Sequence, residues 1–144
     1  MSSTAGAEPR RPRKIARTEE TRAANSGRLA KPYDLALAAA RAALSKKADD
    51  VVLLDLTGQS AVCDYFVIAS GGSEPQVKAI AEAISEQLEL DGQRVWHTEG
   101  YRARRWILLD YVDVVVHVFH RDTREVYQLE RLWADARKEK LADE

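Results

Sequence analysis

Residues 106–119, WILLDYVDVVVHVF, decide the fold because they hold two apolar runs separated by only two residues. The runs 106–111 and 114–119 are rich in β-branched and aromatic residues, which indicates two strands. The short link Val112-Asp113 predicts an antiparallel hairpin, although it lacks the glycine or asparagine that is usual in such turns.

The segments upstream of this hairpin alternate between strand and helix patterns. Short aliphatic runs predict strands at 51–54 and 65–69, and a weaker alternation predicts one at 94–98. Between the last two, Ser73 and Gln76 have the spacing of a helix capping box, and Gly92 stands where that helix would end. A strand, a helix and a further strand in this order predict a parallel crossover.

A helix is expected at each end of this series. Pro32 suits the first turn of a helix that would run to about residue 47. Asp122 or Thr123 would cap a last helix, whose buried stripe is expected to comprise Val126, Leu129, Leu132, Trp133 and Ala136. The fold class is therefore α/β, a single mixed sheet of about five strands packed with helices, in the order α-β-β-α-β-β-β-α.

Charge divides the chain into two parts. Residues 1–31 carry eight basic and three acidic residues, a net charge of +5, and only three large aliphatic side chains. This composition predicts a disordered basic leader, which leaves 32–144 as the folded domain. A mitochondrial transit peptide is a weaker alternative for the leader, and a weak electrostatic contact to RNA is a further one. The folded domain has a net charge of −6, which suits a basic partner better than nucleic acid.

The two faces of the predicted hairpin differ in polarity. Trp106, Leu108 and Asp110 share one face of the first strand, and His117 lies on a matching face of the second. A buried aspartate without a partner is costly, so this face is expected to be the exposed one. The alternative is that Trp106 belongs to the core and that Asp110 pairs with a nearby arginine, at position 102, 104 or 105.

Several stretches resemble the bacterial ribosomal silencing factors, the Iojap-like family. They are DYFVIASG at 64–71, Glu99-Gly100, the hairpin at 106–119 and YQLERLW at 127–133. The resemblance covers roughly residues 33–136 and keeps the order and spacing of the motifs. Val112 departs from the pattern, since many members carry glycine in this turn.

The resemblance implies a translational repressor with no enzymatic activity and no cofactor. Members of the family bind the large ribosomal subunit through a ribosomal protein on its intersubunit face, and so block subunit joining when nutrients run short. The family fold is similar to that of nucleotidyltransferases. In this chain the binding surface would contain Trp106, Leu108, Asp110 and His117, with the carboxylates Glu99 and Asp113 facing basic groups of the partner.

Two other functions remain open from the sequence. The turn Gly71-Gly72-Ser73, between a strand and a helix, would serve a nucleotidyltransferase-like enzyme by binding phosphate. Such enzymes also need paired carboxylates on the following strand, which 94–98 lacks. A generic interaction domain is the third interpretation, with the open sheet face covered by a homodimer when the protein is free.

The remaining signals are weak ones. His117 and His120 would point to opposite faces of a strand, so no metal site is predicted. Cys63 is the only cysteine, which fits a reducing, cytoplasmic compartment. No run of about 18 apolar residues suggests a membrane span.

Overall fold

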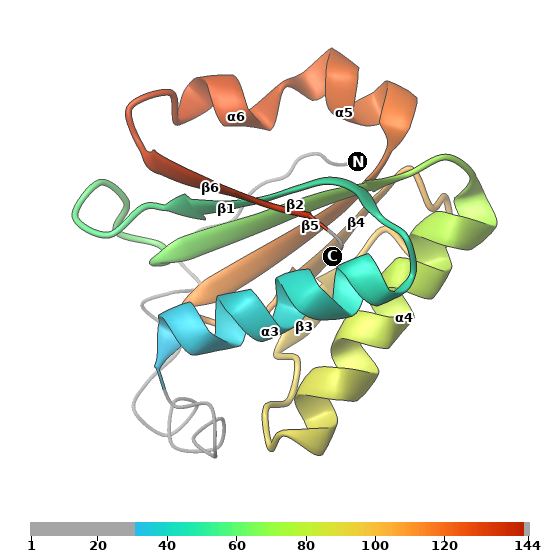
Figure 1. Cartoon of the computed structure of the whole chain (residues 1–144), viewed down its shortest axis with the longest axis horizontal. Coiled ribbons are helices and arrows are strands. Elements are labelled where there is room, and N and C mark those ends of the chain that lie inside the picture. The colour runs from blue at the N-terminus through green and yellow to red at the C-terminus, as the bar shows by residue number, and fades with distance from the viewer. Residues whose placement is uncertain (1–30, 143–144) are drawn as a thin grey trace.

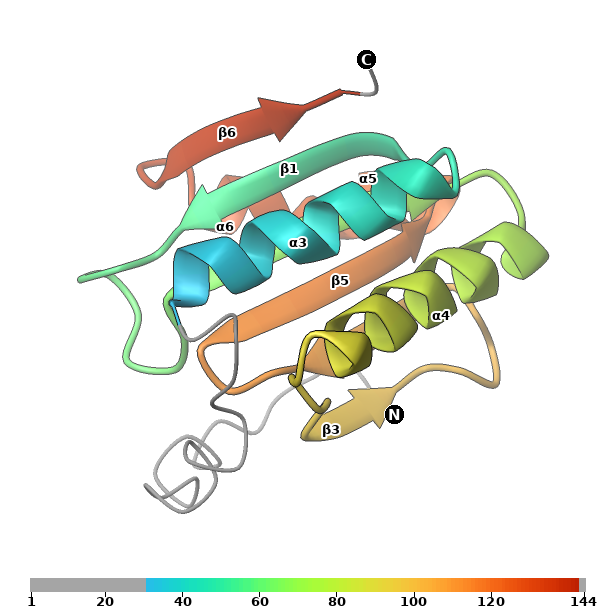
Figure 2. The ribbon, with the colours of Figure 1, turned by 60° about the horizontal axis from the view of Figure 1, so that its bottom comes forward.

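Six strands form one mixed sheet between two helical layers in the computed structural model, which describes residues 31–142 (Figure 1). The strands run in the spatial order β3-β4-β5-β2-β1-β6. Helices α3 and α4 cover one face, and the short helices α5 and α6 lie on the other (Figure 2). The strands are β1 Asp49–Asp55, β2 Tyr65–Gly71, β3 His97–Glu99, β4 Trp106–Asp110, β5 Val114–His120 and β6 Arg137–Leu141. The helices are α3 Pro32–Ser45, α4 Glu74–Leu90, α5 Arg121–Tyr127 and α6 Leu129–Leu132.

The predicted fold class and the predicted hairpin are confirmed. Strands β4 and β5 pair antiparallel, with Trp106 opposite Phe119. Strand β5 also pairs with β2 in parallel, from Tyr65 opposite Val114 onward. The crossover from β2 through α4 leads to β3, which runs in the same direction as β2 but pairs only with β4, at the edge of the sheet.

The sixth strand, β6, was not predicted. Residues 137–141, RKEKL, contain a single apolar residue, so no alternation marks them as a strand. They pair antiparallel with β1, with Leu54 opposite Lys138 and Val52 opposite Lys140. Tertiary pairing, not local propensity, therefore makes this segment a strand.

Helix α4 begins at the predicted cap. The Ser73 hydroxyl accepts a hydrogen bond from the Gln76 amide at 3.2 Å. The Gln76 side-chain oxygen accepts one from the Gly72 amide at 2.7 Å, one residue before its usual capping-box partner. The Gln76 amide group also donates to the carbonyls of Lys46 and Lys47, which ties the start of α4 to the end of α3.

The prediction of one last helix with a buried stripe is wrong. Gln128 adopts a left-handed conformation (φ +46°) and divides the segment into α5 and α6. Val126 and Leu132 are 78% and 74% exposed, because the break turns them away from the sheet. Leu129, Trp133 and Ala136 are half-buried against it. The cap is also different, since His120 Nδ1 accepts a hydrogen bond from the Asp122 amide at 3.2 Å.

The hairpin turn between β4 and β5 holds Val112 at φ +78°. The Asp113 amide donates to the Tyr111 carbonyl at 3.0 Å, and the Tyr111 amide donates to the Val114 carbonyl at 2.8 Å. A positive φ at the centre of such a tight turn is rare and strained, above all for a β-branched residue. The turn therefore stores strain at the position where the family resemblance leads one to expect glycine.

Replacing Val112 by glycine is expected to change the free energy of unfolding by less than about 1 kcal/mol, because relief of backbone strain offsets the lost side-chain burial. The matched control is Val116→Gly, equally buried but within β5, which is expected to cost about 3 kcal/mol. Urea unfolding of the two variants measures both values. Equal losses would show that the turn at Val112 carries no strain.

Candidate functional site

The sheet face opposite α3 and α4 carries the predicted site. Ile107 and Leu109 belong to the core beneath the two long helices. Trp106 and Leu108 point to the other side, where they pack with a second apolar cluster that includes Phe66 and Phe119. The predicted division of β4 into a helix-covered face and a second face is thus confirmed.

Trp106 is held by contacts from three sides. Its ring stacks on Phe119, with centroids 4.8 Å apart, and lies 4.8 Å from the ring of Tyr127 in α5. Its indole Nε1 donates a hydrogen bond to His117 Nδ1 at 3.1 Å. The side chain is half-buried, so Trp106 combines a fixed orientation with a surface that solvent reaches.

The sequence predicted that His117 marks an exposed face. This prediction is wrong, because His117 is only 4% exposed. Its ring lies 4.5 Å from that of Phe66, edge to face, and accepts the indole hydrogen bond of Trp106. An indole can only donate, so His117 Nδ1 is unprotonated. His117 therefore supports Trp106 from below, and its polar ring nitrogen serves to bind the indole of Trp106.

Asp110 is also buried, at 1% exposure, and the prediction that its charge keeps it exposed is wrong. One carboxylate oxygen accepts a hydrogen bond from the Val112 amide at 2.9 Å, and the Asp110 carbonyl accepts one from the Trp96 amide at 2.8 Å. Aspartate commonly bonds the backbone amide two residues further on in turns, and here this bond gives the buried carboxylate a local partner. Asp110 therefore shapes the hairpin turn and the pairing of β3.

The two remaining predicted carboxylates, Glu99 and Asp113, are half-buried and reach solvent. Glu99 lies opposite Leu108 across the β3–β4 pair, and its carboxylate is 2.8 Å from His97 Nε2. Asp113 lies in the hairpin turn, at the far end of β4 from Trp106. The structure thus brings Trp106, Leu108 and Glu99 together on one surface, called here the β3–β4 patch, and leaves Asp113 at its margin.

The segment 121–136, called here the strap, runs over the sheet on the side away from α3 and α4 (Figure 1) and reaches the β3–β4 patch through Tyr127. Tyr127 of the strap meets Trp106, and the ring of Trp133 lies 6.1 Å from that of Phe66. The sequence pattern assigned Trp133 to the buried stripe of the last helix and left Tyr127 without a role, so it missed Tyr127 as a neighbour of Trp106. Helix α5 of the strap lies against β5 and β2, and its Tyr127 reaches Trp106 of β4, while Trp106 and Leu108 both remain partly exposed.

Comparison with known proteins defines the family. The family described as "Ribosomal silencing factor during starvation" matches residues 30–144. This chain belongs to that family. A relative from Bacillus subtilis, named "Ribosomal silencing factor RsfS", is 50% identical over 98 residues, which cover 68% of this chain and 83% of the relative. A mouse relative, named "Mitochondrial assembly of ribosomal large subunit protein 1", is 30% identical over 61% of this chain and 40% of its own length.

Solved structures share the fold of this chain. A protein from Chromobacterium violaceum superimposes with a TM-score of 0.71 at 31% identity, over 72% of this chain and 87% of that one. A protein from Bacillus halodurans gives a TM-score of 0.67 at 42% identity, over 76% and 99% of the two chains.

Groups of the Gly71–Ser73 turn are already in contact with neighbouring side chains of the same chain. The Gly72 amide is bonded to Gln76, and a side chain at Gly72 would meet the Arg121 guanidinium at 3.1 Å. Arg121 in turn pairs with Asp49. These contacts account for the turn as a strand-to-helix connection. Within residues 31–142 no group of three or more metal-ligating side chains converges, and no helix is long and apolar enough to cross a membrane.

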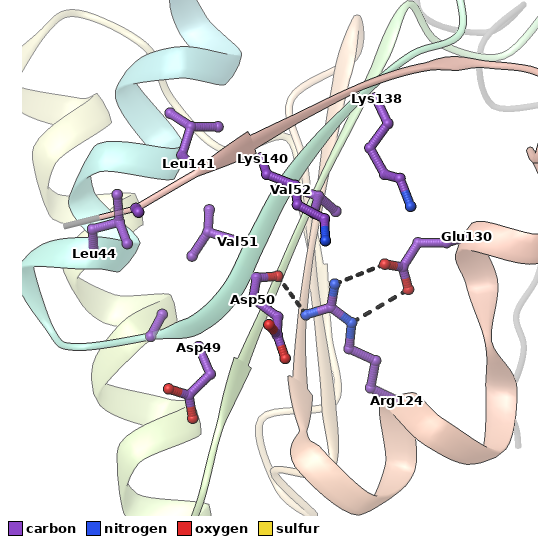
Figure 3. A pocket seen from close by; sticks show the side chains of 12 residues that line it. Leu44, Asp49, Asp50, Val51, Val52, Arg124, Glu130, Lys138, Lys140 and Leu141 are labelled. Carbon is purple, nitrogen blue, oxygen red and sulfur yellow. Dashed lines mark hydrogen bonds and ion pairs between the residues drawn. The ribbon is translucent and has the colours of Figure 1, made fainter.

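A cavity of about 520 Å³ lies between the strap, β1 and β6 (Figure 3). At its wall, Arg124 of α5 forms an ion pair with Glu130 of α6, with Nη2 2.9 Å from Oε2 and Nε 3.3 Å from Oε1. Lys138 and Lys140 of β6 line the same cavity. Burial raises the pKa of Glu130. The hydrogen bonds and charge of Arg124, together with the charge of Lys138, lower it by more, so the pKa lies below the ordinary value.

This pKa shift predicts a loss of stability in acid. Because the Glu130 pKa is lower in the folded state, the ionised pair stabilises the fold at any pH above the ordinary glutamate pKa of about 4.3. That contribution is lost as the pH falls below this value and through the folded pKa. Urea unfolding between pH 7 and pH 3 should show a steeper acid loss for the wild type than for Glu130→Gln. Parallel curves would contradict the assignment.

Proposed function

We propose that the protein binds the large ribosomal subunit, through a ribosomal protein on its intersubunit face, and blocks subunit joining when nutrients are limiting. Membership of a family of ribosomal silencing factors during starvation is the observation that carries this proposal. The name of the mouse relative, which refers to the large ribosomal subunit, supports the choice of subunit.

The β3–β4 patch is the surface we assign to this contact. Trp106 and Leu108 offer half-exposed apolar groups at its centre, and an oriented tryptophan is a frequent anchor of protein interfaces. Glu99 adds a carboxylate beside them, which suits a basic partner and would raise the association rate. In this proposal Asp110 and His117 act from beneath, as supports for the turn and for Trp106, and Asp113 is a contact at the margin.

Repression by occupancy requires neither turnover nor a cofactor. A bound domain that covers the intersubunit surface excludes the small subunit simply by its volume. The contacts of the Gly71–Ser73 turn support this mechanism over nucleotidyl transfer, because the Gly72 amide is already bonded and the Arg121 side chain lies over the turn. The protein would act in the cytoplasm, where ribosomal subunits join.

The test uses two leucine variants with the same chemical change. Leu108→Arg places a charge in the β3–β4 patch, whereas Leu90→Arg places it on the 75% exposed end of α4, on the opposite side of the sheet. Purified full-length protein is sedimented with large subunits, and small subunits are then added. We expect the wild type and Leu90→Arg to travel with large subunits and to reduce joined ribosomes, and Leu108→Arg to bind at least tenfold more weakly, a change of about 1.4 kcal/mol.

Other outcomes would contradict specific parts of the proposal. Sedimentation with small subunits, or with neither, would exclude the proposed target. Normal binding with unreduced joining would exclude steric occlusion. Equal binding by the two leucine variants would place the contact elsewhere than on the β3–β4 patch.

Two weaker contacts complete the proposal. The basic leader would touch ribosomal RNA, although residues 1–30 lie outside the part that the structure describes. The free protein would form a homodimer that covers the β3–β4 patch. Sedimentation of the free protein tests the dimer, because Leu108→Arg should then make it monomeric.

A further inference from the structure

The strap is attached to the sheet by few contacts. No residue of α5 or α6 is fully buried, and Val126 and Leu132 point into solvent. Leu129, Trp133 and Ala136 provide the half-buried apolar contacts. A segment with so little burial opens locally at low free-energy cost unless specific polar contacts hold it.

Arg124 supplies such contacts to three other elements. From α5, its Nη1 donates to the Asp50 carbonyl in β1 at 2.6 Å and to the Ser70 hydroxyl in β2 at 2.8 Å. Its Nε and Nη2 pair with the Glu130 carboxylate in α6. The Arg124 side chain is only 11% exposed; its bonds to Ser70 and Glu130 are partly buried, and its bond to the Asp50 carbonyl lies at the surface. Figure 3 shows the guanidinium between the carboxylate and the backbone of β1.

Strand β1 is shaped to receive this guanidinium. Its pairing with β2 shifts register between Asp49 and Val52, and Asp50 within this bulge has a left-handed backbone with φ +49°. Bulges of this kind redirect single groups at functional places in sheets. Here the Asp50 carbonyl accepts a hydrogen bond from Arg124, so the left-handed backbone of the bulge and the guanidinium meet at one contact.

The same helix turn carries Tyr127, three residues after Arg124 and therefore on nearly the same side of α5. Tyr127 packs against Trp106 at a centroid distance of 4.8 Å. Fixing Arg124 thus fixes the aromatic neighbour of the proposed anchor. We propose that Arg124 is the positioning residue of the docking surface, holding the strap on the sheet so that Tyr127 orients Trp106, an inference that rests on the proposed function.

Geometry, and not charge alone, is what Arg124 contributes. A lysine would keep the positive charge, but a single ammonium group has no planar fork to reach Glu130, Ser70 and the Asp50 carbonyl at once. Lysine is therefore expected to fail as a replacement. A role in bulk charge, in contrast, would be restored by lysine.

The experiment compares Arg124→Lys and Arg124→Gln with Arg131→Gln, which removes an exposed arginine from the same strap. Amide hydrogen exchange of the full-length protein reports opening of residues 121–133 separately from β2 and β5. Large-subunit affinity is measured on the same samples. For both Arg124 variants we expect at least tenfold faster exchange in the strap, near-wild-type exchange in β2 and β5, and at least tenfold weaker binding. Arg131→Gln should match the wild type in every measurement.

If the Arg124 variants do not fold, Glu130→Gln provides the milder test, since it keeps the shape of the pair and removes one charge. The inference is overturned if strap exchange is unchanged in the tested variant, if exchange rises equally in β2 and β5, or if lysine restores binding. Failure of the wild type to bind large subunits would refute the proposed function instead. Strap exchange needs no ribosome, so it would still decide whether Arg124 holds the strap.

Discussion

Gly100→Ala is expected to destabilise the fold by about 3 kcal/mol or more, because a steric conflict with the backbone of β4 adds to the strain of a left-handed conformation. Gly100 has φ +91°, and a Cβ atom at this position would lie 2.0 Å from the Trp106 carbonyl oxygen and 3.2 Å from the Ile107 Cα. Both atoms belong to the backbone at the start of β4, so no side-chain rotation relieves the contact. The backbone of β4 must shift instead, and Trp106 must move with it.

The matched control is Gly58→Ala. Gly58 has φ +83°, close to that of Gly100, but a Cβ atom there would meet nothing within 4 Å. Its alanine variant therefore isolates the conformational cost, about 1 kcal/mol. Urea unfolding of both variants gives the difference between them. Similar losses would show that β4 yields easily and that Gly100 is needed only for its backbone angle.

Trp106→Ala is expected to cost about 3 kcal/mol of stability, at the lower end of the range for a large aromatic residue because the side chain is half-buried. The change removes the stack on Phe119, the contact with Tyr127 and the indole hydrogen bond to His117. It also leaves the His117 Nδ1 acceptor in an apolar environment, which adds to the loss.

The control for Trp106 is Trp96→Ala on the neighbouring edge of the sheet. The Trp96 side chain is 38% exposed, and its backbone pairing with Asp110 does not depend on the ring. Its loss should cost less, about 1 kcal/mol, because Trp96 is more exposed than Trp106. A Trp106→Ala variant as stable as Trp96→Ala would mean that Trp106 serves only a partner. Because Trp106→Ala combines both effects, Leu108 is the better probe of binding.

The sequence was informative where local pattern and burial agree. Alternation along 106–119 identified the hairpin, and the parity of Trp106 and Leu108 identified the face away from the long helices, both of which the structure confirms. Asp110 misled the same reasoning, because its burial depends on a bond to the Val112 amide that only the turn geometry creates.

Features that depend on contacts between distant segments could not be predicted from the sequence. The left-handed backbone at Gln128 breaks the last helix without a glycine or proline to mark it. Strand β6 exists because β1 offers it an edge, and Arg124 gains its contacts only when β1, β2 and α6 converge. Patterns of residue type along the chain carry no information on such contacts between distant segments.

Strand β6 has a consequence for how the chain is made. Of the strands that the structure describes, β6 leaves the ribosome last and its partner β1 first, so the unpaired backbone N–H and C=O groups along 51–54 stay uncovered through most of synthesis. Pairing between such remote segments is slow, and an unpaired strand edge can pair with other nascent chains in the meantime. Once β6 has paired with β1, it covers that edge and becomes the edge strand itself, and its lysines disfavour pairing with further strands.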